Sequence, residues 1–234
     1  MKFSKETIAV LKNFATINSG IVLTPGNFVM TRSIIGTTYA DTTIQDEIDN
    51  ELAIYDLSGF LSVLSLVGDD AEVTLQDDGQ IAIKSNRSAV YWAGADKSTI
   101  VVPKAKASFP VANVITELKA EDLQQLKRVA SGLNLDTITI SNKSGEIVMQ
   151  AYNKTEDPEL VKPKYALTLG EYDGTENFNF VINRDNLKMV PADYKLMLWG
   201  KNLADGKKQT AAKFESDNYT YITAMEIDST FDFE

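Results

Sequence analysis

The sequence predicts an α+β protein of two similar domains, built mainly from antiparallel sheets with few helices. Short stretches of alternating apolar and polar residues recur along the 234-residue chain, separated by turn residues such as Pro25-Gly26-Asn27 and Asp77-Asp78-Gly79. Longer amphipathic stretches are rare. The composition is 44% hydrophobic with nine Tyr, ten Phe and only six Pro, which is typical of a folded, strand-rich chain and not of a disordered one.

The chain length favours two domains, because single cores rarely grow much beyond this size. The best linker is VVPKAKA, residues 101–107, with Ser108-Phe109-Pro110 after it. This stretch lacks strand alternation and is rich in Pro and Lys. We therefore predict an N-terminal domain over residues 1–108 and a C-terminal domain over residues 109–234.

Four amphipathic stretches predict helices. In chain order they are Ser4 to Asn18, Asp56 to Val67, Ala120 to Ser131, and a short one from Arg184 to Met189. The last three each follow a strand, carry an Asp near their start and continue with Leu57, Leu123 or Leu187. An Asp or Asn there accepts hydrogen bonds from first-turn N–H groups. The spacing suggests a fourfold helix-plus-strands repeat, although an ordinary α+β chain with common Asp caps explains it equally well.

Alternating stretches predict strands on both sides of the linker. Before it they cover 20–23, 27–33, 36–44, 51–55, 71–76, 80–85, 88–92 and 98–102. After it they cover 136–142, 146–153, 164–172, 177–183, 194–200, 211–216 and 219–226. Because most neighbours are joined by a few turn residues, such as Lys143-Ser144-Gly145, antiparallel hairpins are expected.

Several function classes are excluded by missing residues. The chain has no His and no Cys, which removes Ser-His-Asp and Cys-His catalysis, thiol redox chemistry and Cys/His zinc sites. The two glycine-rich motifs that bind nucleotides, G-x-x-x-x-G-K-[ST] and G-x-G-x-x-G, are both missing from the sequence. Acidic pairs such as Asp69-Asp70 fall where turns are expected, so a carboxylate or metal enzyme is improbable, and no cofactor or metal is expected. Because no apolar run could span a membrane and the N-terminus lacks a signal peptide's apolar core, a cytoplasmic protein is expected.

Positive charge gathers on the predicted helices of an otherwise acidic chain. The net charge is -10, yet residues 2–12, 119–128 and 184–188 together carry eight Lys/Arg and only four Asp/Glu. On the first helix Lys5, Lys12 and Thr16 point away from the apolar side. Because Lys and Arg are good helix formers, solvated faces alone explain part of this pattern.

A weakly cationic helical face indicates contact with DNA, but the weak charge contacts alone would not keep the protein on the DNA. Screening at physiological salt acts beyond about 8 Å, so cations close to a phosphate outweigh distant carboxylates. One exposed ion pair at 4 Å gives only about 1 kcal/mol in water. Such contacts suit a protein that moves along DNA, and retention would then require a closed ring.

Long sequence blocks resemble the sliding clamps of T-even-type bacteriophages, which are the processivity factors of their DNA polymerases. In chain order the blocks are SKETIAVLKNFATINSGIVL, AIYDLSGFLSVLSLVGDDAE, ELKAEDLQQLKRV, KYALTLGEYDG, FNFVIN, YKLMLWGK, AAKFE and DSTFDF. They run from one end of the chain to the other. One departure is the loop Lys201 to Gln209, where LADGKKQ is longer than the resemblance implies.

The resemblance implies a DNA-clamp fold in which helices line the inner face and antiparallel sheets lie outside. Three copies would form a homotrimeric ring around duplex DNA, opened and closed by an ATP-dependent clamp loader. The clamp itself would catalyse nothing. The implied channel-facing residues are Lys5, Lys12, Lys119, Lys127, Arg128, Arg184 and Lys188.

The resemblance also implies protein partners and a place of action. Clamps of this kind bind the C-terminal peptide of the polymerase and, in this phage group, late-transcription proteins, in the cytoplasm of the infected bacterial host. By analogy the peptide pocket would lie near the linker, with Tyr39, Val101, Val102 and Pro103 as candidates. The alternative is an acidic β-rich virion or adaptor protein with no DNA role, which gives no reason for basic helix faces.

Overall fold

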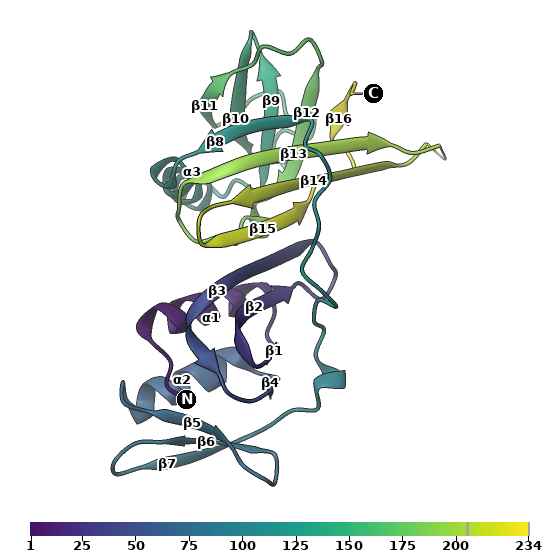
Figure 1. The fold of residues 1–234 in the computed structure, drawn as a ribbon. Coiled ribbons are helices and arrows are strands. Elements are labelled where there is room, and N and C mark those ends of the chain that lie inside the picture. Colours follow the sequence, from purple (N-terminus) through teal and green to yellow (C-terminus); the bar gives the residue numbers. More distant parts are fainter. Residues whose placement is uncertain (205, 234) are drawn as a thin grey trace. The chain divides into compact units, whose positions relative to one another are not determined.

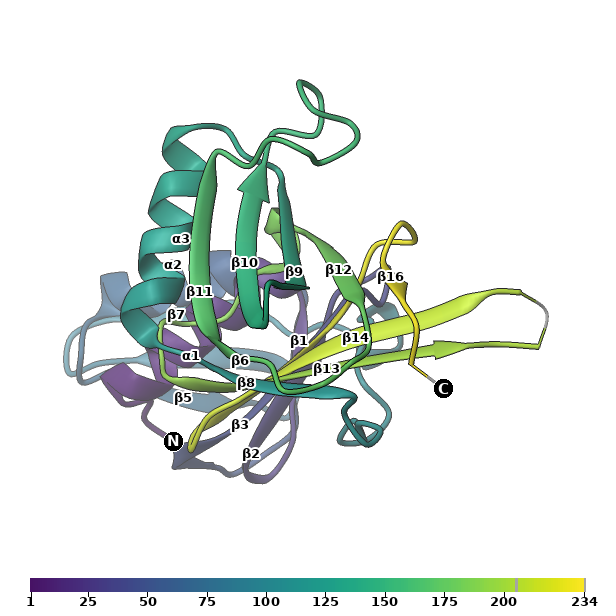
Figure 2. The same ribbon diagram turned by 90° about the horizontal axis from the view of Figure 1, so that it is seen from above.

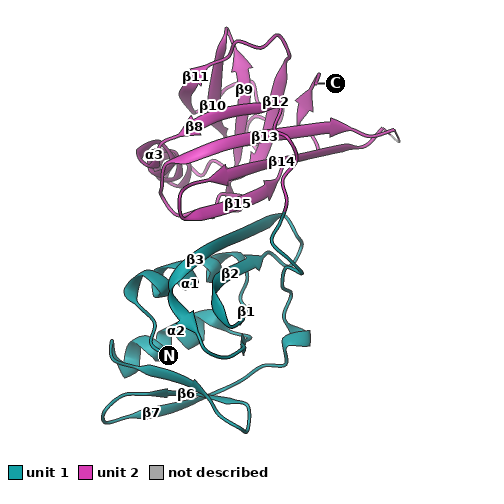
Figure 3. Ribbon diagram, viewed as in Figure 1, with its two compact units in different colours: residues 1–107 teal, residues 108–234 magenta. Residues whose placement is uncertain are grey.

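The computed structural model describes residues 1–204 and 206–233 (Figure 1). The chain divides into two units, residues 1–107 and 108–234 (Figure 3). The boundary predicted from the linker composition lies one residue further along the chain. Asp205, in the loop Lys201 to Gln209 for which the sequence predicts a departure from the resemblance, lies outside the described residues.

Unit 1 contains two helices and three small antiparallel groups of strands. Its elements are α1 (Lys5–Ile17), β1 (Ile21–Leu23), β2 (Gly26–Arg32), β3 (Thr38–Ile48), β4 (Leu52–Ile54), α2 (Leu57–Val67), β5 (Glu72–Leu75), β6 (Gln80–Lys84), β7 (Ala89–Ala93) and the 3₁₀ turn η1 (Lys97–Thr99). Strand β1 pairs with β4, β2 with β3, and β6 lies between β5 and β7. The first residue also pairs with β5, because Met1 and Val73 exchange two backbone hydrogen bonds.

The core of unit 1 lies where the two helices meet the strands. Helix α1 packs against α2 and β3, and Leu11 and Phe14 of α1 are buried together with Phe60 and Leu64 of α2. These residues recur at helical spacing, which is why each helix has one buried side. The opposite sides of both helices therefore remain at the surface.

Unit 2 has two antiparallel sheets and one full helix. Its elements are β8 (Val114–Leu118), α3 (Ala120–Gly132), β9 (Thr137–Lys143), β10 (Glu146–Tyr152), β11 (Tyr165–Glu171), β12 (Phe178–Asn183), the 3₁₀ turn η2 (Arg184–Asn186), β13 (Tyr194–Asn202), β14 (Lys208–Glu215), β15 (Tyr219–Ala224) and β16 (Thr230–Phe231). The strand orders are β11-β10-β9-β12-β16 and β8-β13-β14-β15. Helix α3 lies along the first sheet, and the β13–β14 hairpin extends away from it (Figure 2).

An aromatic cluster closes the edge of the first sheet. Phe180 of β12 stacks on Phe231 of β16 with ring centroids 5.9 Å apart, and Phe231 stacks on Phe233 at 5.8 Å. Gly200 of β13 makes room for this cluster, since a Cβ there would lie 2.8 Å from the ring of Phe231. Phe231 and Phe233, both half-buried, thus pack against the edge of the first sheet.

The element order repeats four times. Each of α1, α2, α3 and η2 is followed by four strands. The predicted fold class, α+β with two similar domains, mainly antiparallel sheet and few helices, is therefore confirmed. Two strands were not predicted, β8 and β16, and the predicted strand 98–102 is wrong, because η1 and irregular backbone occupy that stretch.

The predicted fourth helix, Arg184 to Met189, is also wrong beyond its first turn. Only Arg184–Asn186 form a 3₁₀ turn, and Leu187 and Met189 are both buried while Lys188 between them is half-buried. Burial at every second residue is typical of extended chain. Six residues provide too few hydrogen bonds to offset helix nucleation, and Pro191 disfavours helical backbone just beyond them.

An Asp or Asn side chain caps two of the three predicted helix starts. The carboxylate of Asp56 accepts from the N–H of Gly59 at 2.9 Å and caps α2. At η2 the cap is Asn183, whose side chain accepts from Asp185 N–H. The cap position of α3 is Lys119, with no side-chain cap, and its first N–H finds an acceptor elsewhere, as described below.

Candidate nucleic-acid interface

The outward side of α1 carries two exposed lysines one above the other. Ser4 begins the helix by accepting a hydrogen bond from Thr7 N–H at 3.2 Å, and the buried side then fixes which residues face out. Lys5 and Lys12 are both exposed. Lys5 lies 3.5 Å from Asp69, whereas Lys12 has no ion pair within 4.0 Å among the described residues.

Helix α2 presents hydroxyl groups where α1 presents cations. Ser58, Ser62 and Ser65 are exposed, as the helical spacing predicts, and Leu66 beside them is 85% exposed. A groove of about 500 Å³ runs between these serines and Lys12. The outer side of the helix pair therefore combines serine hydroxyls with one exposed leucine, and its positive charge is supplied by α1.

Helix α3 places one cation at each end of its exposed side. Lys119 Nζ lies 2.8 Å from Glu117 Oε2 and 3.8 Å from Asp193 Oδ2, and the hydrogen bond that it donates to Glu117 is the main reason why the pKa of Lys119 is raised. Arg128 is exposed, and its guanidinium reaches only Gln124, at 3.3 Å. Arg128 thus resembles Lys12 in having no carboxylate partner within 4.0 Å among the described residues.

Residues 184–193 lie along α3 in place of a fourth full helix; this segment begins with η2 and continues without regular helix, and we call it the strap. Three side-chain contacts join it to α3. Arg184 Nη1 donates to Ala130 O at 3.2 Å, Lys127 Nζ donates to Met189 O at 2.6 Å, and Ala120 N–H donates to Asp193 Oδ1 at 2.8 Å. These contacts occur in reverse order along the helix, so the strap runs antiparallel to α3 over about 15 Å.

Lys127 therefore differs from its neighbour Arg128. It is half-buried, and burial lowers the pKa of Lys127 to about 8, because an ammonium loses hydration when it is enclosed. Arg184 is also half-buried, with its side chain between Ala130 O and Asp185. Both cations are bound by groups of unit 2 itself.

The seven predicted channel-facing residues thus fall into two groups. Lys5, Lys12, Lys119 and Arg128 are exposed on helices, or in the case of Lys119 at a helix start. Lys127, Arg184 and Lys188 are half-buried on α3 or the strap. The structure brings the last three together with Arg128 and Lys119 around one helix of unit 2, and Lys5 with Lys12 on one helix of unit 1.

The four residues predicted for a peptide pocket are mostly covered. Tyr39 and Pro103 are buried, and Val101 and Val102 are half-buried. Val101 O accepts from the side-chain amide of Asn18 at 2.8 Å, which ties the linker to the end of α1. Burial raises the pKa of the Tyr39 hydroxyl far above its ordinary value.

Sequence reasoning missed two features of this interface. Asp193 caps α3 from 73 residues away, and no local pattern indicates so distant a partner. The sequence predicts a helix from Arg184 to Met189 because Leu187 follows an Asp, although Pro191 is a usable signal against a helix there.

Other kinds of site find no support in the described part of the chain. No group of three or more His, Cys, Asp or Glu side chains within it could hold a metal ion. Among the same residues, no helix has the length and apolarity needed to cross a membrane.

The chain matches known proteins along its whole length. A family described as DNA polymerase processivity factor matches residues 4–102, and the family described as gp45 sliding clamp, C terminal, matches residues 115–227. The sliding clamp of Escherichia phage RB69 is 60% identical over 233 residues and that of Enterobacteria phage T4 is 56% identical over 233 residues, with 100% of both chains covered in each case.

Solved structures show the same fold at low sequence identity. In the complex described as the C-terminal region of FEN-1 bound to A. fulgidus PCNA, the similar chain has a TM-score of 0.65 and 13% identity, with 95% of this chain and 96% of that chain covered. Together with the identity to the two phage proteins, these findings agree with the resemblance noted from the sequence. The chain therefore belongs to the phage sliding-clamp family of DNA polymerase processivity factors.

Proposed function

We propose that this protein encircles duplex DNA without sequence preference and tethers the replicative polymerase of a bacteriophage. The observation that supports this most directly is the exposure of Lys5, Lys12, Lys119 and Arg128 on helices of a chain with net charge -10. Long-range repulsion is screened, and short-range contacts with phosphates are weak and exchangeable. No catalytic group or cofactor is part of the proposal.

Charge reversal of the two unpaired cations tests the DNA contact. Lys12→Glu combined with Arg128→Glu should shorten the DNA synthesised per polymerase binding event on a primed circular template, with clamp loader and ATP present. The matched control reverses Lys104 and Lys143, which are exposed outside the helices. If both double variants shorten synthesis equally, net charge and not the helix faces is responsible, and the proposed interface is wrong.

A homotrimeric ring would provide the retention that weak contacts cannot. Strand β7 is an open sheet edge carrying the exposed Val90 and Tyr91, and β11 is an open edge of unit 2. Unpaired apolar edges favour pairing with another chain. We propose that β7 of one protomer pairs with β11 of the next, since two different edges per chain allow a closed head-to-tail ring.

The mass in solution tests this assembly. Tyr91→Asp should reduce the trimer to smaller species in sedimentation equilibrium, because a buried unpaired carboxylate opposes edge pairing. Tyr55→Asp is the matched control, since Tyr55 is similarly exposed (63%, against 57% for Tyr91) but lies outside β7. A trimer that survives Tyr91→Asp and fails with Tyr55→Asp would place the interface elsewhere.

The remaining partners follow from the same proposal. They are a C-terminal peptide of the polymerase, an ATP-dependent clamp loader and late-transcription factors, all in the cytoplasm of an infected bacterium. We keep Tyr39, Val101, Val102 and Pro103 as the peptide site, with the half-buried valines as the accessible part. Val102→Asp should weaken binding of the polymerase peptide in a titration, and unchanged affinity would remove this site from the proposal.

A further inference from the structure

Adjacent cations on α3 have opposite surroundings. Lys127 Nζ is 2.6 Å from Met189 O and its side chain is half-buried, whereas Arg128 is exposed and, among the described residues, contacts Gln124 alone. For Lys127 to reach a phosphate, it would have to leave Met189 O without this donor and expose its apolar stem. Such a movement loses a charge-assisted hydrogen bond before any DNA contact forms.

Arg184 is held in a similar way at the other end of the strap. Its Nη1 donates to Ala130 O at 3.2 Å, in the last turn of α3. Carbonyl groups there lack helical partners and carry partial negative charge, so a guanidinium is favoured at this position. Together with Lys127, Arg184 fixes the strap before and after Lys188.

Lys188 lies between two residues that seat the strap on unit 2. Leu187 and Met189 are buried, and Lys188 between them is half-buried. Because burial alternates along this stretch, Lys188 is the most accessible residue of the three. The position of this cation therefore depends on how firmly the strap lies on α3.

We infer that Lys127 and Arg184 are positioning residues, which act on DNA only through Lys188 by fastening the strap to α3. This inference rests on the DNA interface proposed above and changes which of its residues contact phosphate. Lys5, Lys12, Lys119, Arg128 and Lys188 contact phosphate, and Lys127 and Arg184 do not. Unit 2 in this way replaces a fourth helix by an extended segment that still presents a cation.

Amide hydrogen exchange tests the fastening without DNA. Lys127→Met keeps the length of the side chain but removes the donor to Met189 O. Exchange at Leu187 and Val190 should then become about tenfold faster or more, as expected for loss of one charge-assisted hydrogen bond. Arg128→Met, one residue along the same helix, should leave these amides unchanged, and Lys127→Arg should restore slow exchange by supplying a donor again.

The salt dependence of binding to a short blunt duplex tests the route through Lys188. Each lost phosphate contact lowers the slope of log K against log salt by about 0.9. Lys188→Gln and Arg128→Gln should each lower the slope, and their effects should add. Adding Lys127→Met to Lys188→Gln should not lower the slope further, because both changes remove the same contact with phosphate.

Two results would overturn the inference. One is additive slope changes for Lys127→Met and Lys188→Gln, which would make Lys127 a phosphate contact in its own right. The other is unchanged exchange at Leu187 and Val190 in Lys127→Met. If neither Arg128→Gln nor Lys188→Gln alters the slope, the proposed DNA interface fails and the role of Lys188 with it, while faster exchange would still support the fastening.

Discussion

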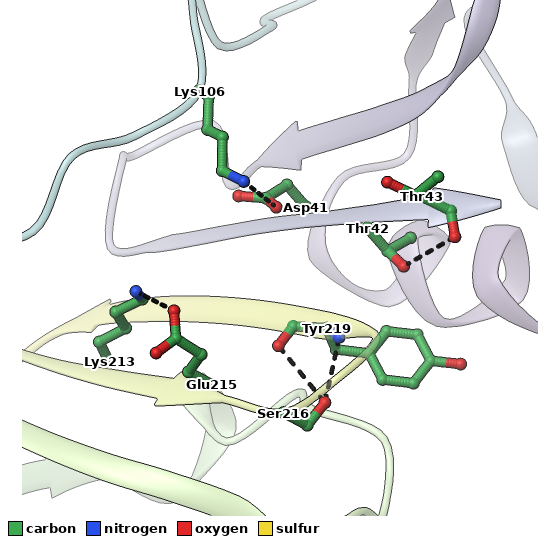
Figure 4. Close-up of polar contacts among 8 residues, drawn as sticks. All are labelled: Asp41, Thr42, Thr43, Lys106, Lys213, Glu215, Ser216 and Tyr219. Carbon is green, nitrogen blue, oxygen red and sulfur yellow. Dashed lines mark hydrogen bonds and ion pairs between the residues drawn. The ribbon is translucent and has the colours of Figure 1, made fainter.

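Lys106 Nζ lies 3.7 Å from Oδ1 of Asp41, a carboxylate that is almost fully buried in β3 (Figure 4). The ammonium also lies 5.5 Å from the ring centroid of Phe28. Oδ2 of Asp41 and the hydroxyl of Tyr39 are buried without a hydrogen-bond partner among the described residues. The end of the linker is thus held on unit 1 by one exposed lysine over a buried charge.

Removing Lys106 should destabilise unit 1 more than loss of an ordinary surface lysine. Lys106→Met leaves Asp41 without its cation, and an unpaired buried carboxylate costs several kcal/mol. Because the Lys106 side chain is 65% exposed, solvent screening reduces the expected loss to about 1–2 kcal/mol. Urea denaturation at fixed protein concentration measures it.

Two further variants separate this ion pair from general effects of charge. Lys104→Met, at an exposed position two residues earlier, should change the free energy of unfolding by less than about 0.5 kcal/mol. Adding Asp41→Asn to Lys106→Met should recover part of the loss, since an amide costs less to bury than a carboxylate. Equal losses for Lys104→Met and Lys106→Met would contradict the prediction.

The burial of Lys127 predicts a stability that rises at alkaline pH. The pKa of Lys127 is lowered to about 8 in the folded chain, whereas an unfolded lysine titrates near 10.5. Between these values the unfolded state binds more protons, so the free energy of unfolding increases with pH. Below pH 8 the side chain is protonated in both states, and the cost of burying it is fully present.

Comparison with Lys127→Met isolates this effect from other titrating groups. Wild-type protein should gain stability relative to the variant as the pH rises from 8 to 9.5, by on the order of 1 kcal/mol after screening by solvent. Guanidinium denaturation across this range is the measurement. The difference in free energy of unfolding between wild type and Lys127→Met could instead stay constant over this pH range, or the wild type could lose stability relative to the variant. Either result would show that Lys127 is not desolvated.

Asp193 should stabilise α3 from outside the helix. Asp193→Ala leaves the N–H of Ala120 without its acceptor, which should cost about 1 kcal/mol, as for other lost N-caps. Asp193→Asn keeps an acceptor oxygen and should cost only a few tenths. Exchange of the Ala120 amide identifies the site, and equal losses for Ala and Asn would attribute the effect to charge instead.

Local patterns predicted the elements whose partners are near in sequence. The stripe of Leu57, Phe60 and Leu64 predicted both α2 and its buried side, because the helix satisfies its own backbone. The strap could not be predicted in this way, since its contacts lie 54 to 73 residues away in sequence. A long-range contact gives no periodic signal in either segment.

The candidate site shows the same limit. Helical spacing placed Lys5, Lys12 and Arg128 on exposed faces correctly. The resemblance also implies a channel-facing Lys127, but helical spacing shows only the direction of a side chain around one helix and not what covers it. Which cations remain exposed was decided by the strap, whose path helical spacing does not contain.

Gly200 should tolerate no side chain, because the aromatic cluster of unit 2 occupies that space. A Cβ at this position would lie 2.8 Å from the Phe231 ring, and moving the ring would disturb its stacking on Phe180 and Phe233. Gly200→Ala should therefore lower the free energy of unfolding by about 1–3 kcal/mol, the usual cost of overpacking a core.

Gly132→Ala is the matched control, since a Cβ at that position would meet no atom within 4 Å. Alanine at the end of α3 should be neutral or stabilising by up to about 1 kcal/mol. A Gly200→Ala protein as stable as wild type in urea would mean that the C-terminal residues yield easily and that β16 adds little to the core.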